Sequence, residues 1–141
     1  MIKFKISSDL GLSNIIRAKD IMNTKVSIED IHSTINNTAK KLLYSNENYA
    51  IIIENDLPVG IVTADDFIKH IAKGTNHATT SIEEIMTVDL INCGPEQSIW
   101  DLGDLMHARG ISKIPIIDEY DKLVGIVNFL DLLKVFSMKK N

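Results

Sequence analysis

The 141-residue sequence contains a single cysteine, Cys93, so no disulfide can form within the chain. A lone thiol favours a reducing compartment, and we therefore expect a cytoplasmic protein. No apolar run approaches the roughly 20 residues that a membrane-spanning helix needs. The first residues, MIKFKISSDL, alternate between apolar and polar side chains and form no apolar block, so we expect no secretory signal peptide.

The chain also has fewer basic residues than acidic ones. Fifteen lysines and arginines face 19 acidic residues, which leaves a formal net charge of −4 at pH 7. Proteins that bind nucleic acid draw much of their affinity from positive charge, so a nucleic-acid partner is not expected. Apolar residues make up 45 % of the chain and charged residues 24 %, which is the balance of a globular protein with a buried core.

Residue sets that carry catalysis or bind metals are missing as well. The histidines show no close metal-ligand spacing; they are His32, His70, His77 and His107. Cys93 has no recognisable partner for nucleophilic catalysis. Asp65 and Asp66 are adjacent, and adjacent residues on a helix do not face one another, so they do not form an acid–base pair. We expect neither a metal site nor an enzyme.

What the sequence does contain is an internal repeat. GIVTADDF at residues 60–67 returns in outline as GIVNFLDL at residues 125–132, an offset of 65. Asp-Ile-Met at residues 20–22 returns as Glu-Ile-Met at residues 84–86, an offset of 64. One single-residue gap therefore aligns the two halves, and a repeat of this kind indicates two copies of one structural unit.

Both halves predict the same order of elements. In the first half we expect strands at residues 26–28, 49–53 and 59–62, and helices at residues 30–43 and 63–74, with Asp30 as a helix cap. In the second half we expect strands at residues 90–91, 114–117 and 123–127. Its helices are expected from the cap Ser98 to Gly110 and through residues 130–136.

Each half is thus β-α-β-β-α, which predicts an α/β (mixed α+β) fold with a mixed sheet. A half of about 60 residues is marginal alone, so we expect the repeats to pack as a pseudo-two-fold pair. The expected boundaries are residues 1–17 for an N-terminal extension, 18–74 for the first domain, 75–81 for a linker and 82–141 for the second domain. Residues 1–7 alternate in polarity and are a possible edge strand.

This ordered set of motifs resembles a tandem pair of CBS domains, named for cystathionine β-synthase and called a Bateman module. The resemblance rests on the Asp-Ile-Met and Glu-Ile-Met lead-ins, on Ser112-Lys113-Ile114-Pro115 and on the two Gly-apolar-apolar-polar-x-x-Asp junctions. It covers residues 18–138, nearly the whole chain. With no further domain in the sequence, we expect a stand-alone module.

The resemblance implies a regulatory module whose cleft between the repeats binds an adenosine-containing ligand, namely AMP, ADP, ATP or S-adenosylmethionine. The junction aspartate is then expected to accept hydrogen bonds from both ribose hydroxyls. The small polar residue three positions before it is expected to contact ribose or phosphate, and the start of the strand is expected to contact adenine. Carried over to this sequence, the first site comprises Asn48, Tyr49, Ala50, Thr63 and Asp66. The second site comprises Ser112, Lys113, Ile114, Pro115, Asn128 and Asp131.

The two sites depart from the family pattern in different ways. Ala50 stands where the second repeat has Pro115, the strand start of the first repeat carries an acid and no base, and Asn128 replaces the usual threonine or serine. A simpler alternative also fits both junctions. A polar residue followed three positions later by an acid is a helix capping box, worth about 1 kcal/mol without any ligand.

At the level of function, the alternative to a nucleotide sensor is a ligand-free scaffold for dimerisation or interaction. The family implies a homodimer, and a two-fold contact would bring each surface against its own copy. Candidate interface residues are Met22, Met86, Trp100 to Leu105, Val135 and Phe136. No obligatory cofactor is expected, and the regulated partner protein is not identified by the sequence.

Overall fold

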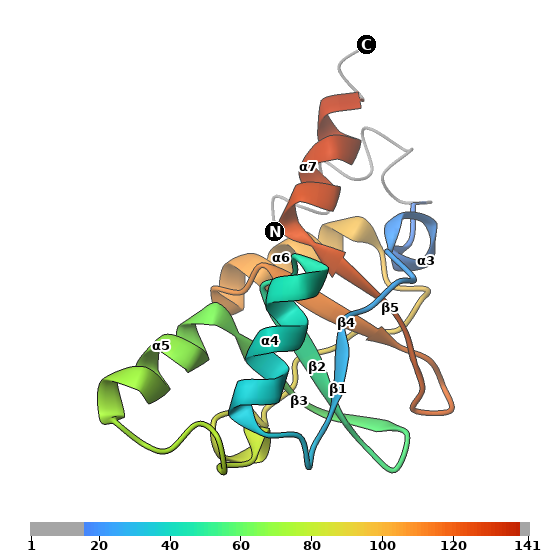
Figure 1. Ribbon diagram of the computed structural model, residues 1–141. Coiled ribbons are helices and arrows are strands. Elements are labelled where there is room, and N and C mark those ends of the chain that lie inside the picture. The colour runs from blue at the N-terminus through green and yellow to red at the C-terminus, as the bar shows by residue number, and fades with distance from the viewer. Residues whose placement is uncertain (1–15, 139–141) are drawn as a thin grey trace. The chain divides into compact units, whose positions relative to one another are not determined.

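The computed structural model describes residues 16–138 and divides the chain into two compact units (Figure 1). One unit is formed by Val26–Leu90, and the other combines residues 16–25 with residues 91–138. The boundaries differ from those of the repeats. The segment that begins each repeat, with Asp-Ile-Met at residues 20–22 or Glu-Ile-Met at residues 84–86, is its lead-in, and each lead-in packs in the unit that holds the other repeat's sheet. The possible edge strand at residues 1–7 lies outside the described residues.

The unit Val26–Leu90 contains a three-stranded mixed sheet of order β1-β2-β3. Its elements are β1 (Ile28–Asp30), α4 (Ile35–Ser45), β2 (Tyr49–Glu54), β3 (Leu57–Thr63), α5 (Ala64–Lys73) and the short 3-10 helix η1 (Ile82–Glu84). β1 is parallel to β2, and β2 and β3 form an antiparallel hairpin. This is the predicted β-α-β-β-α order, with β1 two residues later than expected.

The first long helix starts later than predicted, and its cap is a different residue. Asp30 lies in β1, where its carboxylate accepts a hydrogen bond from the His32 backbone at 2.7 Å. Thr34 caps α4 instead, with its hydroxyl accepting from the Asn37 backbone at 3.0 Å. The sequence prediction named Asp30 alone, and the turn between β1 and α4 places Thr34 at the cap. The expected end of α5 at Gly74 is confirmed, with φ +74°.

β2 is the centre of this unit. Tyr49, Ala50, Ile51 and Ile52 are all buried, as expected for a strand covered on both faces. Ala50 and Ile52 contact a cluster that also holds Ile31, Ile35, Leu42, Val62 and Ile82. This cluster joins α4 and η1 to the sheet.

The second unit is built from α3 (Ala18–Ile21), α6 (Ile99–Arg109), β4 (Lys113–Ile117), β5 (Leu123–Asn128) and α7 (Phe129–Met138). β4 and β5 form an antiparallel hairpin. Ser98 caps α6 by accepting from the Asp101 backbone at 3.2 Å, and Gly110 ends it with φ +64°, both as predicted. The strand expected at residues 90–91 is not formed; a single parallel bridge between Cys93 and Ile116 takes its place.

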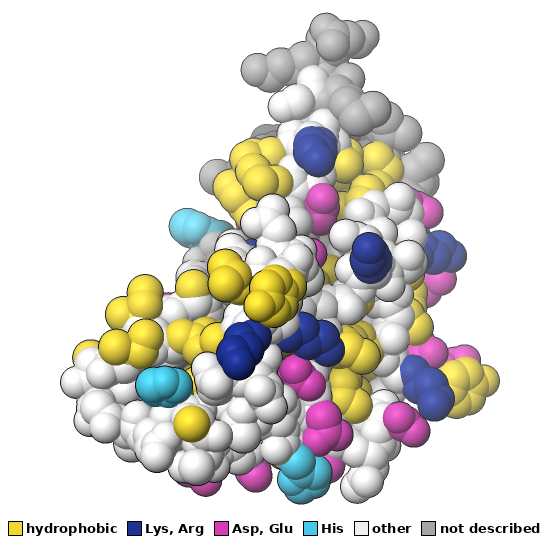
Figure 2. Space-filling model, viewed as in Figure 1, with side chains coloured by type: hydrophobic (Ala, Val, Ile, Leu, Met, Phe, Trp, Pro, Cys, Tyr) yellow, Lys and Arg dark blue, Asp and Glu magenta, His cyan; other side chains and the backbone are white. Residues whose placement is uncertain are grey.

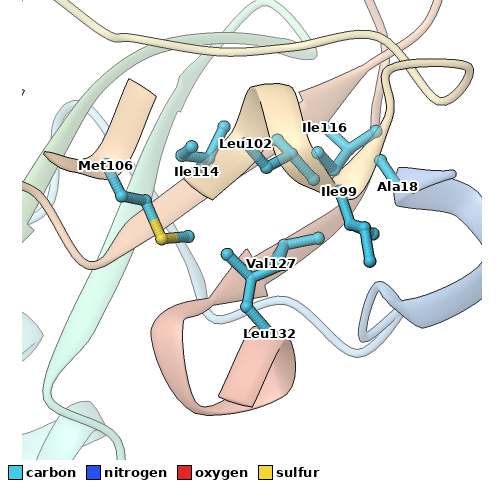
Figure 3. Close-up of a cluster of buried hydrophobic side chains, with 8 residues drawn as sticks. All are labelled: Ala18, Ile99, Leu102, Met106, Ile114, Ile116, Val127 and Leu132. Atoms are coloured by element: carbon cyan, nitrogen blue, oxygen red, sulfur yellow. The ribbon is translucent and has the colours of Figure 1, made fainter. Parts of the chain in front are cut away.

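The core of the second unit is a continuous apolar cluster between α6, α7 and the hairpin (Figure 3). It consists of Ala18, Ile99, Leu102, Met106, Ile114, Ile116, Val127 and Leu132. Ala18 belongs to α3, so the lead-in of the first repeat contributes to the core formed by the second. The cluster includes residues from both strands of the hairpin that carries the second candidate site.

A methionine from each lead-in covers a glycine in the middle of a strand. Met86 lies over Gly60 of β3, and Met22 lies over Gly125 of β5. A methyl group at Gly60 would stand 2.8 Å from the Met86 sulfur, and one at Gly125 would stand 2.5 Å from the Met22 sulfur. The glycines of the repeated Val-Gly-Ile-Val motif are therefore required by this close approach.

Candidate functional site

In the first repeat the candidate residues meet where β3 runs into α5. Tyr49 lies opposite Thr63 in the hairpin, so the start of β2 is next to the end of β3. The Ala64 backbone donates to the Asn48 carbonyl at 3.2 Å, which ties the start of the helix to the start of the strand. Residues 14 to 16 positions apart are brought to one place by the hairpin register.

The second repeat reproduces this arrangement. Lys113 lies opposite Asn128 in the β4–β5 hairpin. The Phe129 backbone donates to the Ser112 carbonyl at 2.8 Å, in the position that corresponds to the Ala64–Asn48 bond. The structure thus brings together each set of residues that the sequence assigned to a site, within its own unit.

Both junction aspartates cap their helices. The Thr63 backbone donates to Asp66 Oδ2 at 2.9 Å, and the Thr63 hydroxyl lies 3.4 Å from the same oxygen. In the second repeat the Asn128 backbone donates to Asp131 Oδ2 at 2.9 Å, and the Asp131 backbone donates to Asn128 Oδ1 at 3.0 Å. The predicted capping boxes are present.

Capping occupies only one oxygen of each carboxylate. Among the described residues, no donor bonds Oδ1 of Asp66 or of Asp131. Both side chains are half-buried, and each stands at the start of a ten-residue helix, where the helix dipole is positive. A carboxylate oxygen with free lone pairs beside a helix N-terminus can accept ligand hydroxyls while the other oxygen keeps the cap.

Other candidate residues are buried, so their side chains are not available to a ligand. The side chains of Tyr49, Ala50, Ile114 and Pro115 belong to the packed interior. The Tyr49 hydroxyl accepts from the Ser27 backbone at 3.1 Å, and burial raises the pKa of this tyrosine. The exposed or half-buried side chains at the two sites are those of Asn48, Thr63, Asp66, Ser112, Lys113, Asn128 and Asp131.

A cavity of about 600 Å³ opens beside Asp66, along one side of α5. Lys69, His70 and Lys73 follow Asp66 along this helix and line the cavity together with residues of the linker. None of these three residues belongs to the junction motifs of the sequence. Their spacing from Asp66 is the helical i+3, i+4 and i+7 pattern, and that pattern is the sequence signal that places them on one face.

The part of the chain that the structure describes has neither a metal-binding cluster nor a membrane-spanning helix. Within residues 16–138, no group of three or more His, Cys, Asp or Glu side chains is placed to hold a metal ion. In the same range, none of the helices combines the length and apolar character that crossing a membrane requires.

The chain belongs to the CBS domain family. The family's domain model matches it twice, over residues 18–73 and 82–138. These two matches cover most of the chain and coincide with the repeats found in the sequence. The resemblance to a tandem CBS pair is therefore confirmed.

Relatives in the archaeon Methanocaldococcus jannaschii are longer than this chain. The uncharacterized protein MJ0188 is 29 % identical over 121 residues, which is 84 % of this chain and 43 % of that protein. The L-aspartate semialdehyde sulfurtransferase is 32 % identical over 129 residues, which is 91 % of this chain and 25 % of the enzyme. The chain thus spans less than half of the length of either relative.

The fold is that of solved CBS domain pairs. The CBS domain pair of protein MJ0100, crystallised in complex with 5′-methylthioadenosine and S-adenosyl-L-methionine, superposes with a TM-score of 0.79 at 30 % identity. The superposition covers 89 % of this chain and 98 % of that one. The mixed α+β fold with two related repeats is thereby confirmed.

Proposed function

We propose that this chain is a regulatory module that binds an adenosine-containing ligand and transmits its presence to a partner protein in the cytosol. The observation that carries this proposal is the pair of junctions, each of which presents a capping aspartate with one oxygen to which no described residue donates. The similar domain pair of MJ0100, which holds S-adenosylmethionine and methylthioadenosine, supports the choice of ligand class. The chain itself is proposed to have no catalytic activity.

A ribose fits such a junction for a simple chemical reason. Its two neighbouring hydroxyls are both donors, and a carboxylate can accept from both at once in charge-assisted hydrogen bonds. The backbone at the strand start, at Asn48 in one site and Ser112 in the other, is within the same junction and is proposed to contact adenine. Lys113 is half-buried opposite Asn128 and supplies positive charge at the second site.

Thermal unfolding with a panel of ligands tests the proposal. At a concentration 100 times its dissociation constant, a ligand adds about 2.7 kcal/mol to the free energy of unfolding, which raises Tm by several degrees. We expect this rise with at least one of AMP, ADP, ATP and S-adenosylmethionine, and a smaller rise with the matching 2′-deoxy compound. Unchanged Tm with every ligand at millimolar concentration would sink the proposal and leave the ligand-free scaffold.

We also propose that the chain forms a homodimer. In the unit Val26–Leu90, large apolar side chains gather on the outer surfaces of α4 and α5 (Figure 2). These are Leu43, Tyr44, Ile68 and Ile71, each more than 60 % exposed. By contrast, the interface candidates taken from the sequence, among them Met22, Met86, Trp100 and Phe136, pack against the cores of their own units. The exposed set is therefore the better candidate for an interface.

Sedimentation velocity at micromolar concentration checks the dimer. We expect a dimer for the natural chain and a monomer for the double variant Tyr44→Glu/Ile71→Glu, because charges placed in an apolar contact are left unpaired. Val88→Glu is the control, since Val88 is 70 % exposed in the same unit but lies outside both helices. A natural chain that sediments only as a monomer contradicts the dimer. A Val88→Glu variant that also sediments as a monomer contradicts the placement of the interface on α4 and α5.

A further inference from the structure

One side of helix α7 is apolar and exposed. Phe129, Leu130 and Leu133 are 48, 63 and 42 % exposed, although Leu132 of the same helix is buried in the core of the unit. Phe129, Leu133 and Phe136 follow the helical i, i+4 and i+7 spacing and therefore share one side of α7, which Leu130 borders. Figure 2 shows apolar side chains on the surface over this helix. We call Phe129, Leu130, Leu133 and Phe136 the outer face of α7.

The outer face of α7 continues onto α6. Phe136 packs against Trp100 of α6, with 5.1 Å between the ring centroids. A methyl group on Gly103, about one turn further along α6, would lie 3.9 Å from the Leu132 side chain, so the two helices run in opposite directions. The Trp100 end of α6 is therefore beside the C-terminal end of α7.

The indole N–H of Trp100 lacks an acceptor among the described residues. Its nitrogen is buried, and no residue in the range 16–138 accepts a hydrogen bond from it. Folded proteins supply a partner to nearly every buried donor, because an unpaired one is unfavourable. We therefore expect the acceptor at Trp100 to come from outside the described residues.

The described part of the chain begins at this same place. The backbone of Ile99, the first residue of α6, donates to the Ile16 carbonyl at 3.2 Å. Ile16 also packs against the core of the unit, as Trp100 and Phe136 do. Residues 1–15 lie outside the described part of the chain, but residue 15 is bonded to Ile16. This segment is therefore joined to the molecule beside the Trp100 end of α6.

The sequence that precedes Ile16 matches the surface in length and in chemistry. Helix α6 has 11 residues and is about 16 Å long, a distance that an extended chain covers with about five residues. Residues 10–15 read LGLSNI and carry no charge, like the outer face of α7. The segment supplies two leucines for apolar contact, and Ser13 and Asn14 supply hydrogen-bond acceptors close to its attachment point.

We propose that residues 10–15 bind across Trp100 and the outer face of α7 in the same molecule. The two leucines of the segment cover the apolar side chains, and Ser13 or Asn14 accepts from the Trp100 indole. Because the segment is tethered at Ile16, its effective concentration at this face is about millimolar, well above that of a second copy in dilute solution. The chain thus covers the exposed face of this unit with a segment of its own.

The fluorescence of Trp100 tests the contact, since this is the single tryptophan of the chain. The double variant Leu10→Asp/Leu12→Asp places two charges in an apolar contact and is expected to release the segment. The emission maximum then moves to longer wavelength and quenching by acrylamide increases, because water reaches the indole. Ser7→Asp/Ser8→Asp is the matched control. It adds the same charge to the same segment outside the proposed contact, and it should leave both signals unchanged.

Chemical cross-linking distinguishes a contact within one molecule from a contact between copies. The full chain carries Cys93→Ala, so that the thiols introduced by Leu12→Cys and Leu133→Cys are the only two, and a short bismaleimide joins them. We expect a cross-linked monomer whose yield is the same at every protein concentration. Leu12→Cys with Lys122→Cys is the control, because Lys122 is exposed between β4 and β5, outside both helices.

Two results would overturn the inference. One is a folded Leu10→Asp/Leu12→Asp variant whose emission and quenching equal those of the natural chain. The other is a cross-linked monomer in no greater yield than in the control. In that second case, a cross-linked dimer in its place assigns the outer face of α7 to a second copy. Circular dichroism checks that the aspartate variant is folded, and if it is not, the cross-link alone decides.

Discussion

Gly60→Ala is expected to lower the free energy of unfolding by about 1–3 kcal/mol, although it adds only one methyl group. Gly60 is buried in β3, and the new methyl carbon would stand 2.8 Å from the Met86 sulfur and 2.9 Å from the Thr87 carbonyl oxygen. The methionine side chain can turn aside, but the carbonyl belongs to the backbone. It also accepts from the Ile61 backbone at 3.0 Å, so moving it weakens the bridge that holds the lead-in on the strand.

A matched substitution elsewhere in the chain should have the opposite effect. Gly103 lies in the interior of α6, and a methyl group there meets nothing closer than the Leu132 side chain at 3.9 Å. Gly103→Ala should therefore raise the free energy of unfolding by about 0.5–1 kcal/mol, because alanine loses less backbone entropy in a helix. Thermal and urea unfolding of both variants measure the two effects.

A further variant separates the two contacts at Gly60. Met86→Ala removes the sulfur from above Gly60 but leaves the Thr87 carbonyl in place. In the Met86→Ala background, Gly60→Ala should consequently cost less than in the natural chain and still be destabilising. If Gly60→Ala unfolds at the temperature of the natural chain, the lead-in does not lie against β3 at this distance.

The elements of the fold were predictable because their signals are local. Ser98 and Gly110 mark the ends of α6 through the chemistry of a hydroxyl cap and of a positive φ, and neither depends on the rest of the chain. The error at Asp30 also has a local cause. Asp30 and Thr34 are both good caps, and only the turn after β1, which is set by its pairing with β2, decides between them.

Long-range arrangement was less predictable from the sequence. The repeats indicated where the lead-ins are, but not that Met22 covers Gly125 and Met86 covers Gly60, because each pair joins segments far apart in the chain. The candidate sites fall between these cases. Hairpin register brings Tyr49 opposite Thr63 and Lys113 opposite Asn128, and the repeat made that pairing predictable. The cavity along α5 depends on the path of residues 75–81, which carry no periodic pattern.

Asp66→Asn and Asp131→Asn are expected to lower ligand affinity by ten- to more than a hundredfold at each site that binds. Asparagine keeps one oxygen to accept the backbone hydrogen bond of the cap, but it replaces the second oxygen by an NH₂ donor and removes the charge. The ribose hydroxyls then lose their charged acceptor, which amounts to roughly 1.5–3 kcal/mol. Calorimetric titration of each variant with AMP, ATP and S-adenosylmethionine measures the loss.

The stability of the same variants separates binding from capping. Both aspartates accept a backbone hydrogen bond at 2.9 Å in the free chain, so weakening the cap costs a few tenths to about 1 kcal/mol of folding free energy with or without ligand. Asp65→Asn serves as the control, because it removes the same charge next to Asp66 from an exposed side chain that makes no capping bond. A true ribose contact also predicts that the substitution weakens binding of a 2′-deoxy ligand less than binding of the matching ribose ligand, since one of the two hydroxyls is absent from the deoxy compound. If both aspartate variants bind adenosine ligands as tightly as the natural chain, the two carboxylates serve only as helix caps.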